Sequence, residues 1–129
     1  MSVHFSAIRD NWKTPKALYE QLDREFQFDF DPCPPDPYFD GLTIEWGMCN
    51  FVNPPYGRVI GDWLRKAHEE AAKGKTSVFL IPSRTDTRWW HEWVMSANEI
   101  RFIKGRLCFD DQPNPAPFPS VIVVIRPHN

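Results

Sequence analysis

The sequence lacks any apolar run long enough to cross a membrane, and its first fifteen residues, MSVHFSAIRDNWKTP, contain no stretch of signal-peptide length. It also lacks internal repeats and low-complexity tails. These absences argue against a membrane protein, a repeat array and a disordered chain. We therefore expect residues 1–129 to form one soluble cytoplasmic domain, with residues 1–11 as a flexible N-terminus.

Cysteine is scarce, and an excess of positive charge is absent. The three cysteines, Cys33, Cys49 and Cys108, are an odd number without paired metal-ligand spacing, so reduced thiols are expected. The four histidines are too dispersed to suggest a metal cluster, and we assign no metal site. The net charge of −2 provides no overall basic field, so binding to nucleic acid would require a local patch.

Apolar and aromatic residues are plentiful. The 129 residues are 42% apolar and 15% aromatic, with six Trp and ten Phe. This length is sufficient for one hydrophobic core. The aromatic content fits either a heavily aromatic core or a site that stacks on flat ligands.

Helical periodicity and short apolar runs alternate along the chain. Thr14 is predicted as the N-cap of a first helix, with Pro15 at its first position and Leu18, Leu22 and Phe26 on its buried face. Further helices are predicted at 60–75 and 84–97, the latter capped by Asp86 or Thr87, and strands at 26–31, 48–52, 77–82, 99–109 (bent or bulged) and 120–127.

This alternation predicts a three-layer α/β sandwich with a mostly parallel sheet. The continuous apolar run SVFLIP is typical of a central parallel strand that is covered on both faces. Ligands of such sheets lie beyond the carboxyl ends of the strands. Three loops are expected there: one after Asp31, one at 53–56 and one after Pro82.

The stretch FVNPPYGR, residues 51–58, ends an apolar run with two prolines. Each proline disfavours the helical conformation of the residue before it, so Asn53 and Pro54 are expected to be extended. The Asn53 side-chain oxygen and the Pro54 carbonyl can then converge as two acceptors, with the ring of Tyr56 beside them. A simple proline-rich turn is the alternative interpretation.

Two converging acceptors and a flat ring suit a planar –NH2 group. Such a nitrogen is a poor nucleophile because its lone pair is delocalised. Hydrogen bonds to both N–H groups favour a pyramidal nitrogen, which returns the lone pair to the reacting direction. The electrophile must then be held in line with that lone pair, and no strong general base is required.

These motifs resemble those of the phage-type DNA adenine methyltransferase family (Dam-type). The matching pieces run in order over residues 12–126: WKTP, FDFDPC, DGL, NPPYG, RTDTRWWH, GRLCF and PFPS. The resemblance implies a minimal Rossmann-like fold and transfer of a methyl group from S-adenosylmethionine to the exocyclic amine of adenine in DNA. It further implies a phage or prophage gene expressed in a bacterial host.

The resemblance also implies roles for individual residues. The flipped-out adenine would be held by a catalytic corner of Asn53, Pro54, Pro55 and Tyr56. The cofactor would be bound by Trp12, Thr14, Pro15, Asp31, Pro32, Cys33 and Asp40, and nucleic acid by Arg84, Asp86, Arg88 and Arg106.

Two features depart from the usual methyltransferase pattern. DPCPPDP stands where a glycine-rich turn normally contacts the cofactor, and no glycine occurs until Gly41. The pattern also lacks the strand whose acidic tip normally holds the ribose hydroxyls, and Asp36 or Asp40 would have to substitute for it.

Other interpretations remain open from the residues alone. Pro32-Cys33 resembles the Pro-Cys nucleophile of cytosine C5-methyltransferases, but a small loop residue is the simpler interpretation. Arg84, Arg88, Arg101, Lys104 and Arg106 form either a basic surface or scattered solvated charge. Trp89 either stacks on a base or is buried.

The function, too, has alternatives. The same corner could methylate RNA adenine or protein glutamine, or the chain could be a nucleic-acid-binding relic without turnover. No separate recognition domain fits in 129 residues, so short-site specificity is expected, with a homodimer as one way to extend the footprint.

Overall fold

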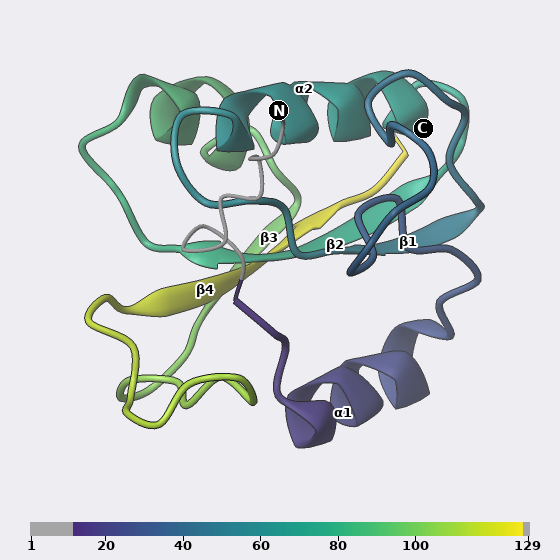
Figure 1. The fold of residues 1–129 in the computed structure, drawn as a ribbon. Coiled ribbons are helices and arrows are strands. Elements are labelled where there is room, and N and C mark those ends of the chain that lie inside the picture. The colour runs from purple at the N-terminus through teal and green to yellow at the C-terminus, as the bar shows by residue number, and fades with distance from the viewer. Residues whose placement is uncertain (1–11, 128–129) are drawn as a thin grey trace.

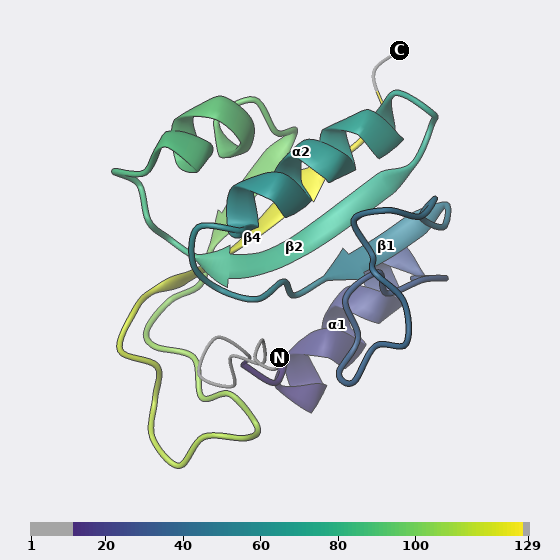
Figure 2. The same cartoon turned by 45° about the horizontal axis from the view of Figure 1, so that its top comes forward.

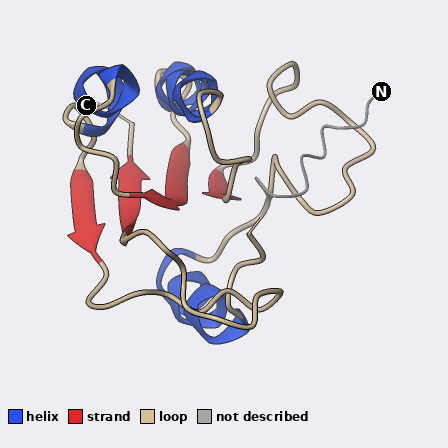
Figure 3. Cartoon of the chain, turned by 60° about the vertical axis from the view of Figure 1, so that its left-hand side comes forward, coloured by secondary structure: helices blue, strands red, loops and turns tan. Residues whose placement is uncertain are grey.

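The computed structural model describes residues 12–127, so the flexible N-terminus expected at 1–11 lies outside the described residues. A four-stranded sheet lies between one helix on one face and two helices on the other (Figure 1). The turned view in Figure 3 shows these three layers edge-on. The elements are α1(Lys16–Phe26), β1(Cys49–Val52), α2(Ile60–Ala71), β2(Thr76–Pro82), η3(Trp90–Val94), β3(Glu99–Phe102) and β4(Ser120–Ile125).

The sheet is mixed, with the strand order β1-β2-β4-β3. Only β1 and β2 are parallel, and β4 runs antiparallel to both β2 and β3. The predicted mostly parallel sheet is therefore wrong, although the α/β sandwich is confirmed. The error has a physical cause: a continuously apolar strand indicates burial on both faces, which the helices provide here whatever the strand direction.

The strand predicted at 26–31 is reduced to a single parallel bridge between Phe30 and Asn50. The chain leaves α1 through Gln27, whose φ of 58° is left-handed. The Asp29 carboxylate then accepts the N–H groups of Met48 and Cys49. The Phe30 bridge and the β1–β2 pair are both parallel. The loops after Asp31, after β1 and after Pro82 therefore leave the sheet at the same edge, as predicted.

The core is built from β2, β4 and α2. Every residue of β4 is buried, as are six of the seven in β2. The predicted inner face of α2 is confirmed, with Ile60, Trp63, Leu64, Ala67 and Ala71 buried. Burial of this continuous apolar layer fixes β1 and β2, whose carboxyl ends carry the candidate site.

The starts of two helices test the predicted caps. Pro15, not Thr14, occupies the N-cap of α1, and the Asp110 carboxylate accepts the Lys16 N–H at 2.9 Å in place of a local cap. The predicted third helix is shorter than expected, ending in the π-helical turn η3. Its cap is Thr87, whose hydroxyl accepts the Trp90 N–H at 3.2 Å.

A buried carboxylate, Glu70, binds the residues that precede β1 and β2, at the opposite end of these strands from the corner. Its Oε1 accepts the Trp46 N–H and the Lys75 ammonium, both at 2.9 Å. Lys73 and Lys66 approach its Oε2 at 3.0 and 3.3 Å. Burial alone would raise the pKa of Glu70, but these hydrogen bonds outweigh it and hold the pKa at about 2.

Candidate active site

The Asn-Pro-Pro-Tyr corner follows directly after β1. The Asn53 amide nitrogen donates to the Trp12 carbonyl and to the Thr14 hydroxyl, the latter at 3.0 Å. Its Oδ1 is buried and has no hydrogen-bond partner among the described residues. A buried acceptor left unpaired costs about 1–3 kcal/mol. The corner therefore presents an unsatisfied acceptor of the kind that a ligand N–H group would satisfy.

The two prolines after Asn53 lie inside the fold. Pro54 is buried and Pro55 is half-buried. Neither can donate from its backbone nitrogen, so the carbonyls are the only polar backbone groups that they offer. Within residues 12–127 the Pro54 carbonyl accepts no hydrogen bond.

Tyr56 is more enclosed than the sequence predicted. Its side chain is only 4% exposed, and its hydroxyl donates to the Leu80 carbonyl at 3.1 Å. Burial raises the pKa of Tyr56 far above neutrality, so the hydroxyl is neutral and cannot act as a base. The ring is surrounded by Trp12, Phe109 and Phe118. The expected open ring face beside the amine is thus covered.

The segment that carries Trp12 and Thr14 is held by the loop at 103–119. Asp111 accepts the Lys13 N–H at 3.0 Å, and the Asp110 N–H donates to the Lys13 carbonyl at 3.1 Å. Figure 2 shows this loop, in yellow-green, beside the start of α1. Both aspartates are exposed, and no sequence signal links positions so far apart along the chain.

Asp31 and Cys33 lie in the loop that follows the Phe30 bridge. Burial raises the pKa of Asp31 to about 6, although the Cys33 N–H, which donates to Oδ1 at 2.9 Å, lowers it. Burial also raises the pKa of the Cys33 thiol to about 12. Cys33 is therefore protonated at neutral pH, which disfavours a nucleophilic role.

The loop from Pro32 to Gly41 folds back on itself where a glycine-rich turn was missing. A Cβ on Gly41 would lie 2.0 Å from the Pro32 carbonyl oxygen and 2.8 Å from the Trp63 ring. The Asp40 carboxylate is exposed and accepts the Leu42 N–H at 3.0 Å. Close packing of this loop, rather than a glycine turn, shapes the edge of the sheet here.

The residues beside the corner fit a cationic, hydroxyl-bearing cofactor. Asp31 Oδ2 accepts no hydrogen bond from the described chain, whereas Oδ1 is used by Cys33. A poorly solvated carboxylate with a free oxygen suits an ammonium, a sulfonium or a sugar hydroxyl. The polar contacts of the 12–15 segment run instead to Asn53 and to the 103–119 loop. These contacts do not bear on the cofactor role that is expected for residues 12–15.

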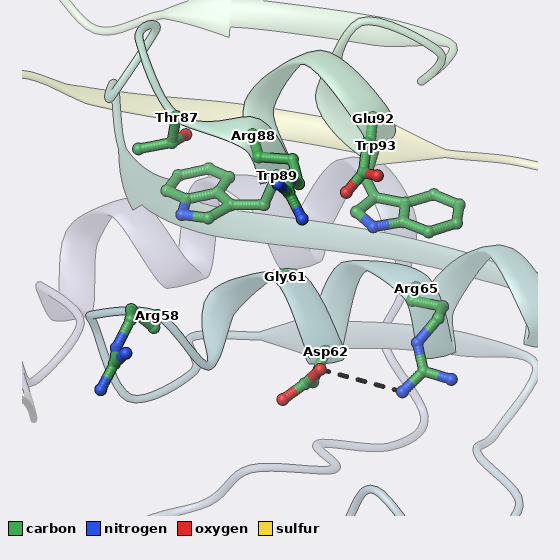
Figure 4. Close-up of a pocket in the computed structure, with 9 residues that line it drawn as sticks. All are labelled: Arg58, Gly61, Asp62, Arg65, Thr87, Arg88, Trp89, Glu92 and Trp93. Atoms are coloured by element: carbon green, nitrogen blue, oxygen red, sulfur yellow. Dashed lines mark ion pairs between the residues drawn. The ribbon is translucent and has the colours of Figure 1, made fainter.

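A groove of about 590 Å³ lies between α2 and the helical turn that ends in η3 (Figure 4). Arg58, just after the corner, and Arg88, just after β2, both line it. Arg65 also lines it but approaches Asp62 at 3.8 Å. The absence of a Cβ at Gly61 permits close contact with Trp89, which is buried, the second of the two roles expected for it.

The remaining predicted nucleic-acid residues are scattered. Arg84 and Asp86 are exposed in the loop after β2, and the Arg84 guanidinium lies 5.9 Å from the centre of the Phe118 ring. Arg106 is exposed in the 103–119 loop, away from the groove. Arg101 is no part of a basic surface because Glu25 and Glu99 bind its guanidinium at 2.6 and 2.8 Å.

In the part of the chain that the structure describes, no group of three or more His, Cys, Asp or Glu residues is placed to hold a metal ion. No described helix has the length and apolar character needed to cross a membrane.

The corner places a buried acceptor without a hydrogen-bond partner among the described residues at the carboxyl edge of an α/β sheet. The sequence model of the family described as DNA N-6-adenine-methyltransferase (Dam) matches residues 2–128. The chain belongs to this family. It is also 29% identical to the DNA N-6-adenine-methyltransferase of Haemophilus phage HP1, over an alignment that covers 74% of this chain and 62% of that relative. The chain thus spans less than two thirds of that relative's length.

Proposed function

We propose that this protein transfers a methyl group from S-adenosylmethionine to the exocyclic amine of adenine in DNA. The observation that carries the proposal is the unpartnered, buried Oδ1 of Asn53 at the edge of the sheet. Family membership supports the same activity. The cofactor, when bound, supplies an electrophilic methyl group.

Asn53 and Pro54 act directly on the target nitrogen. The Asn53 Oδ1 accepts one amine N–H and the Pro54 carbonyl accepts the other. Both hydrogen bonds strengthen as the nitrogen becomes pyramidal, so they lower the barrier more than they tighten ground-state binding. Pro55 keeps this carbonyl in place by restricting the backbone of Pro54.

Tyr56 offers a stacking surface for the base once Trp12 has moved. Its hydroxyl is engaged by Leu80 and neutral, so the ring contributes packing and no proton transfer. The adenine has to leave the duplex, at a cost of a few kcal/mol for unstacking. Stacking on an aromatic ring, worth about 1–3 kcal/mol per base, offsets much of that cost.

The cofactor lies, on this proposal, in a reduced Rossmann-like site at the same edge. Asp31 provides a free carboxylate oxygen for the positively charged part of the cofactor. Pro32 and Cys33 shape the loop, and Asp40 replaces the missing acidic strand tip. Trp12, Thr14 and Pro15 close the site from the N-terminal side.

DNA is the substrate that two arginines beside the corner favour. Arg58 and Arg88 line one groove beside the corner, and neither has an ion-pair partner within residues 12–127. Phosphates that flank a flipped base would lie against them, and Arg84 and Arg106 would contact the DNA backbone elsewhere. Asp86 would limit the approach of the backbone by repulsion. The reaction would take place in the cytoplasm of a bacterial host.

The direct test is incubation of the protein with cofactor and unmethylated DNA, followed by nucleoside mass spectrometry. We expect 6-methyladenine from the wild type and a loss of at least about 100-fold in Asn53→Ala, because a transition-state acceptor is removed. Equal product from both would remove Asn53 from the mechanism. Parallel reactions with RNA and protein extracts test the alternative substrates. If calorimetry detected no cofactor binding, either to the protein alone or in the presence of DNA, the protein would be a nucleic-acid-binding relic without turnover.

A further inference from the structure

Among residues 12–127, the Asn53 amide is held from one side only. Both hydrogen bonds of its nitrogen run to the N-terminal segment: one to the Trp12 carbonyl and one, at 3.0 Å, to the Thr14 hydroxyl. A carbonyl oxygen accepts and cannot donate. The group that faces Trp12 must therefore be the NH2, and Oδ1 must point away from the segment.

This orientation decides what the corner offers to an amine. An Asn side chain can turn its terminal amide by half a rotation at little torsional cost, because that torsion is broad and roughly two-fold. The turned amide would present donors to an incoming –NH2 group, which also donates. Only the observed orientation gives the amine an acceptor, and Oδ1 is the unpartnered buried atom.

We propose that Thr14 is a positioning residue for methyl transfer. Its hydroxyl, together with the Trp12 carbonyl, keeps Asn53 Oδ1 directed at the substrate amine. The inference rests on the proposed function. It gives Thr14 a role toward the nucleophile, in place of the cofactor role that the family resemblance implies.

Hydrogen bonds anchor the segment on both sides of Thr14. Lys13 is bonded on both sides to the 103–119 loop, by Asp111 at its N–H and by the Asp110 N–H at its carbonyl. The Asp110 carboxylate also holds the Lys16 N–H at 2.9 Å. Thr14 thus lies between two residues fixed by the same distant loop. The ring and the carbonyl of Trp12 make separate contacts: the ring packs on Tyr56, Phe109 and Phe118, and the carbonyl accepts from Asn53.

Three variants test the inference by steady-state kinetics of methyl transfer. Thr14→Val keeps the shape and removes the hydroxyl, Thr14→Ser keeps the hydroxyl, and Thr76→Val is the matched control at the amino end of β2. We expect Thr14→Val to lower kcat by about tenfold, with KM for DNA and for cofactor within about twofold, because the lost contact acts in the transition state. Thr14→Ser and Thr76→Val should stay within about twofold of the wild type.

The kinetic pattern separates the two possible roles of Thr14. A rise in KM for the cofactor with unchanged kcat would assign Thr14 to cofactor binding and overturn the inference. So would failure of Thr14→Ser to restore kcat, since that result would mean that packing and not the hydroxyl matters.

A second readout does not depend on turnover. In nuclear magnetic resonance spectra, the Asn53 side-chain NH2 signals, assigned with Asn53→Asp, should shift in Thr14→Val and remain in place in Thr14→Ser. Unchanged signals in Thr14→Val would overturn the inference even in an active enzyme. Absence of methyl transfer by the wild type would instead overturn the proposed function, so the two failures are distinguishable.

Discussion

The indole of Trp12 lies nearly parallel to the ring of Tyr56, with 6.4 Å between the ring centroids and 20° between the planes. Phe118 packs edge-on against both rings, with centroid distances of 5.1 and 5.7 Å. The carbonyl of the same tryptophan accepts a hydrogen bond from Asn53. The side chain of Trp12 therefore covers Tyr56, whereas its backbone carbonyl binds Asn53. A substitution of Trp12 removes the first contact and leaves the second.

Truncation of this cover should make base binding easier and the fold weaker. We expect Trp12→Ala to lower the free energy of unfolding by about 2–3 kcal/mol, because a partly buried indole leaves the aromatic cluster. Affinity for an adenine-rich single strand should rise about fivefold, since no ring has to be displaced. Denaturation followed by circular dichroism and fluorescence anisotropy measure the two effects.

Trp12→Phe, which keeps a ring over Tyr56, is the matched control and should change the affinity little. If Trp12→Ala lost the expected stability but bound the strand no better than the wild type, Trp12 would be part of the core only. Tyr56 would then need another route to the base.

Asp31 should weaken the fold at neutral pH because its carboxylate is poorly solvated. Burial raises its pKa from 3.8 to about 6, so between these values the folded protein holds more protons than the unfolded chain. This contribution to stability falls as the pH rises from about 4 to about 6 and then stays constant. Asp31→Asn removes the ionisation and should be about 1–3 kcal/mol more stable at pH 7, with this slope abolished.

The same substitution should raise Kd for the cofactor at least about tenfold, which calorimetry at pH 7 measures. Glu69→Gln is the control, since it removes an exposed carboxylate on α2 that has no part in the proposed site. Equal cofactor affinity in Asp31→Asn and the wild type would place the cation-binding group elsewhere.

Local patterns in the sequence predicted much of this arrangement. Helical periodicity identified the α2 face, and apolar runs identified β1, β2 and β4, because each reports burial of neighbouring residues. The NPPY corner was found because prolines restrict the backbone locally. Strand direction was missed because burial carries no direction.

Contacts between distant segments could not be predicted in the same way. The bonds from Asp110 and Asp111 to the start of α1 join residues more than 90 positions apart. The closeness of Trp12, Phe109 and Phe118 around Tyr56 likewise depends on how loops close over the sheet. Thr14 was predicted as a helix cap because threonine before proline locally favours a cap. In the structure its hydroxyl instead accepts a hydrogen bond from the distant Asn53 amide.

The groove between α2 and η3 should contribute to DNA affinity through charge. We expect the double variant Arg58→Ala/Arg88→Ala to weaken binding about equally for all sequences. The slope of log K against log salt should become shallower by about 2, because two phosphate contacts are lost. Fluorescence anisotropy at several salt concentrations measures both quantities.

Arg24→Ala is the matched control, since Arg24 is exposed on α1 at the opposite face of the sheet. It should leave the salt slope unchanged. Loss of the same slope in the control and in the double variant would show that overall charge, and not the groove, attracts DNA.

Glu70 should be the main acid-sensitive support of the fold. Its pKa of about 2 lies below the ordinary value of 4.5, so its contribution is fully present above about pH 4.5 and is lost as the pH falls toward 2. Glu70→Gln leaves Lys66, Lys73 and Lys75 without their shared carboxylate and should cost about 2–3 kcal/mol at pH 7. Urea denaturation between pH 2 and 7 should show a flatter profile for the variant, with Glu69→Gln, an exposed neighbour, close to the wild type. If stability fell equally with pH in Glu70→Gln and in the wild type, the Glu70 carboxylate would not be the acid-sensitive group. The lysines would then have other partners that hold α2 and the start of β2.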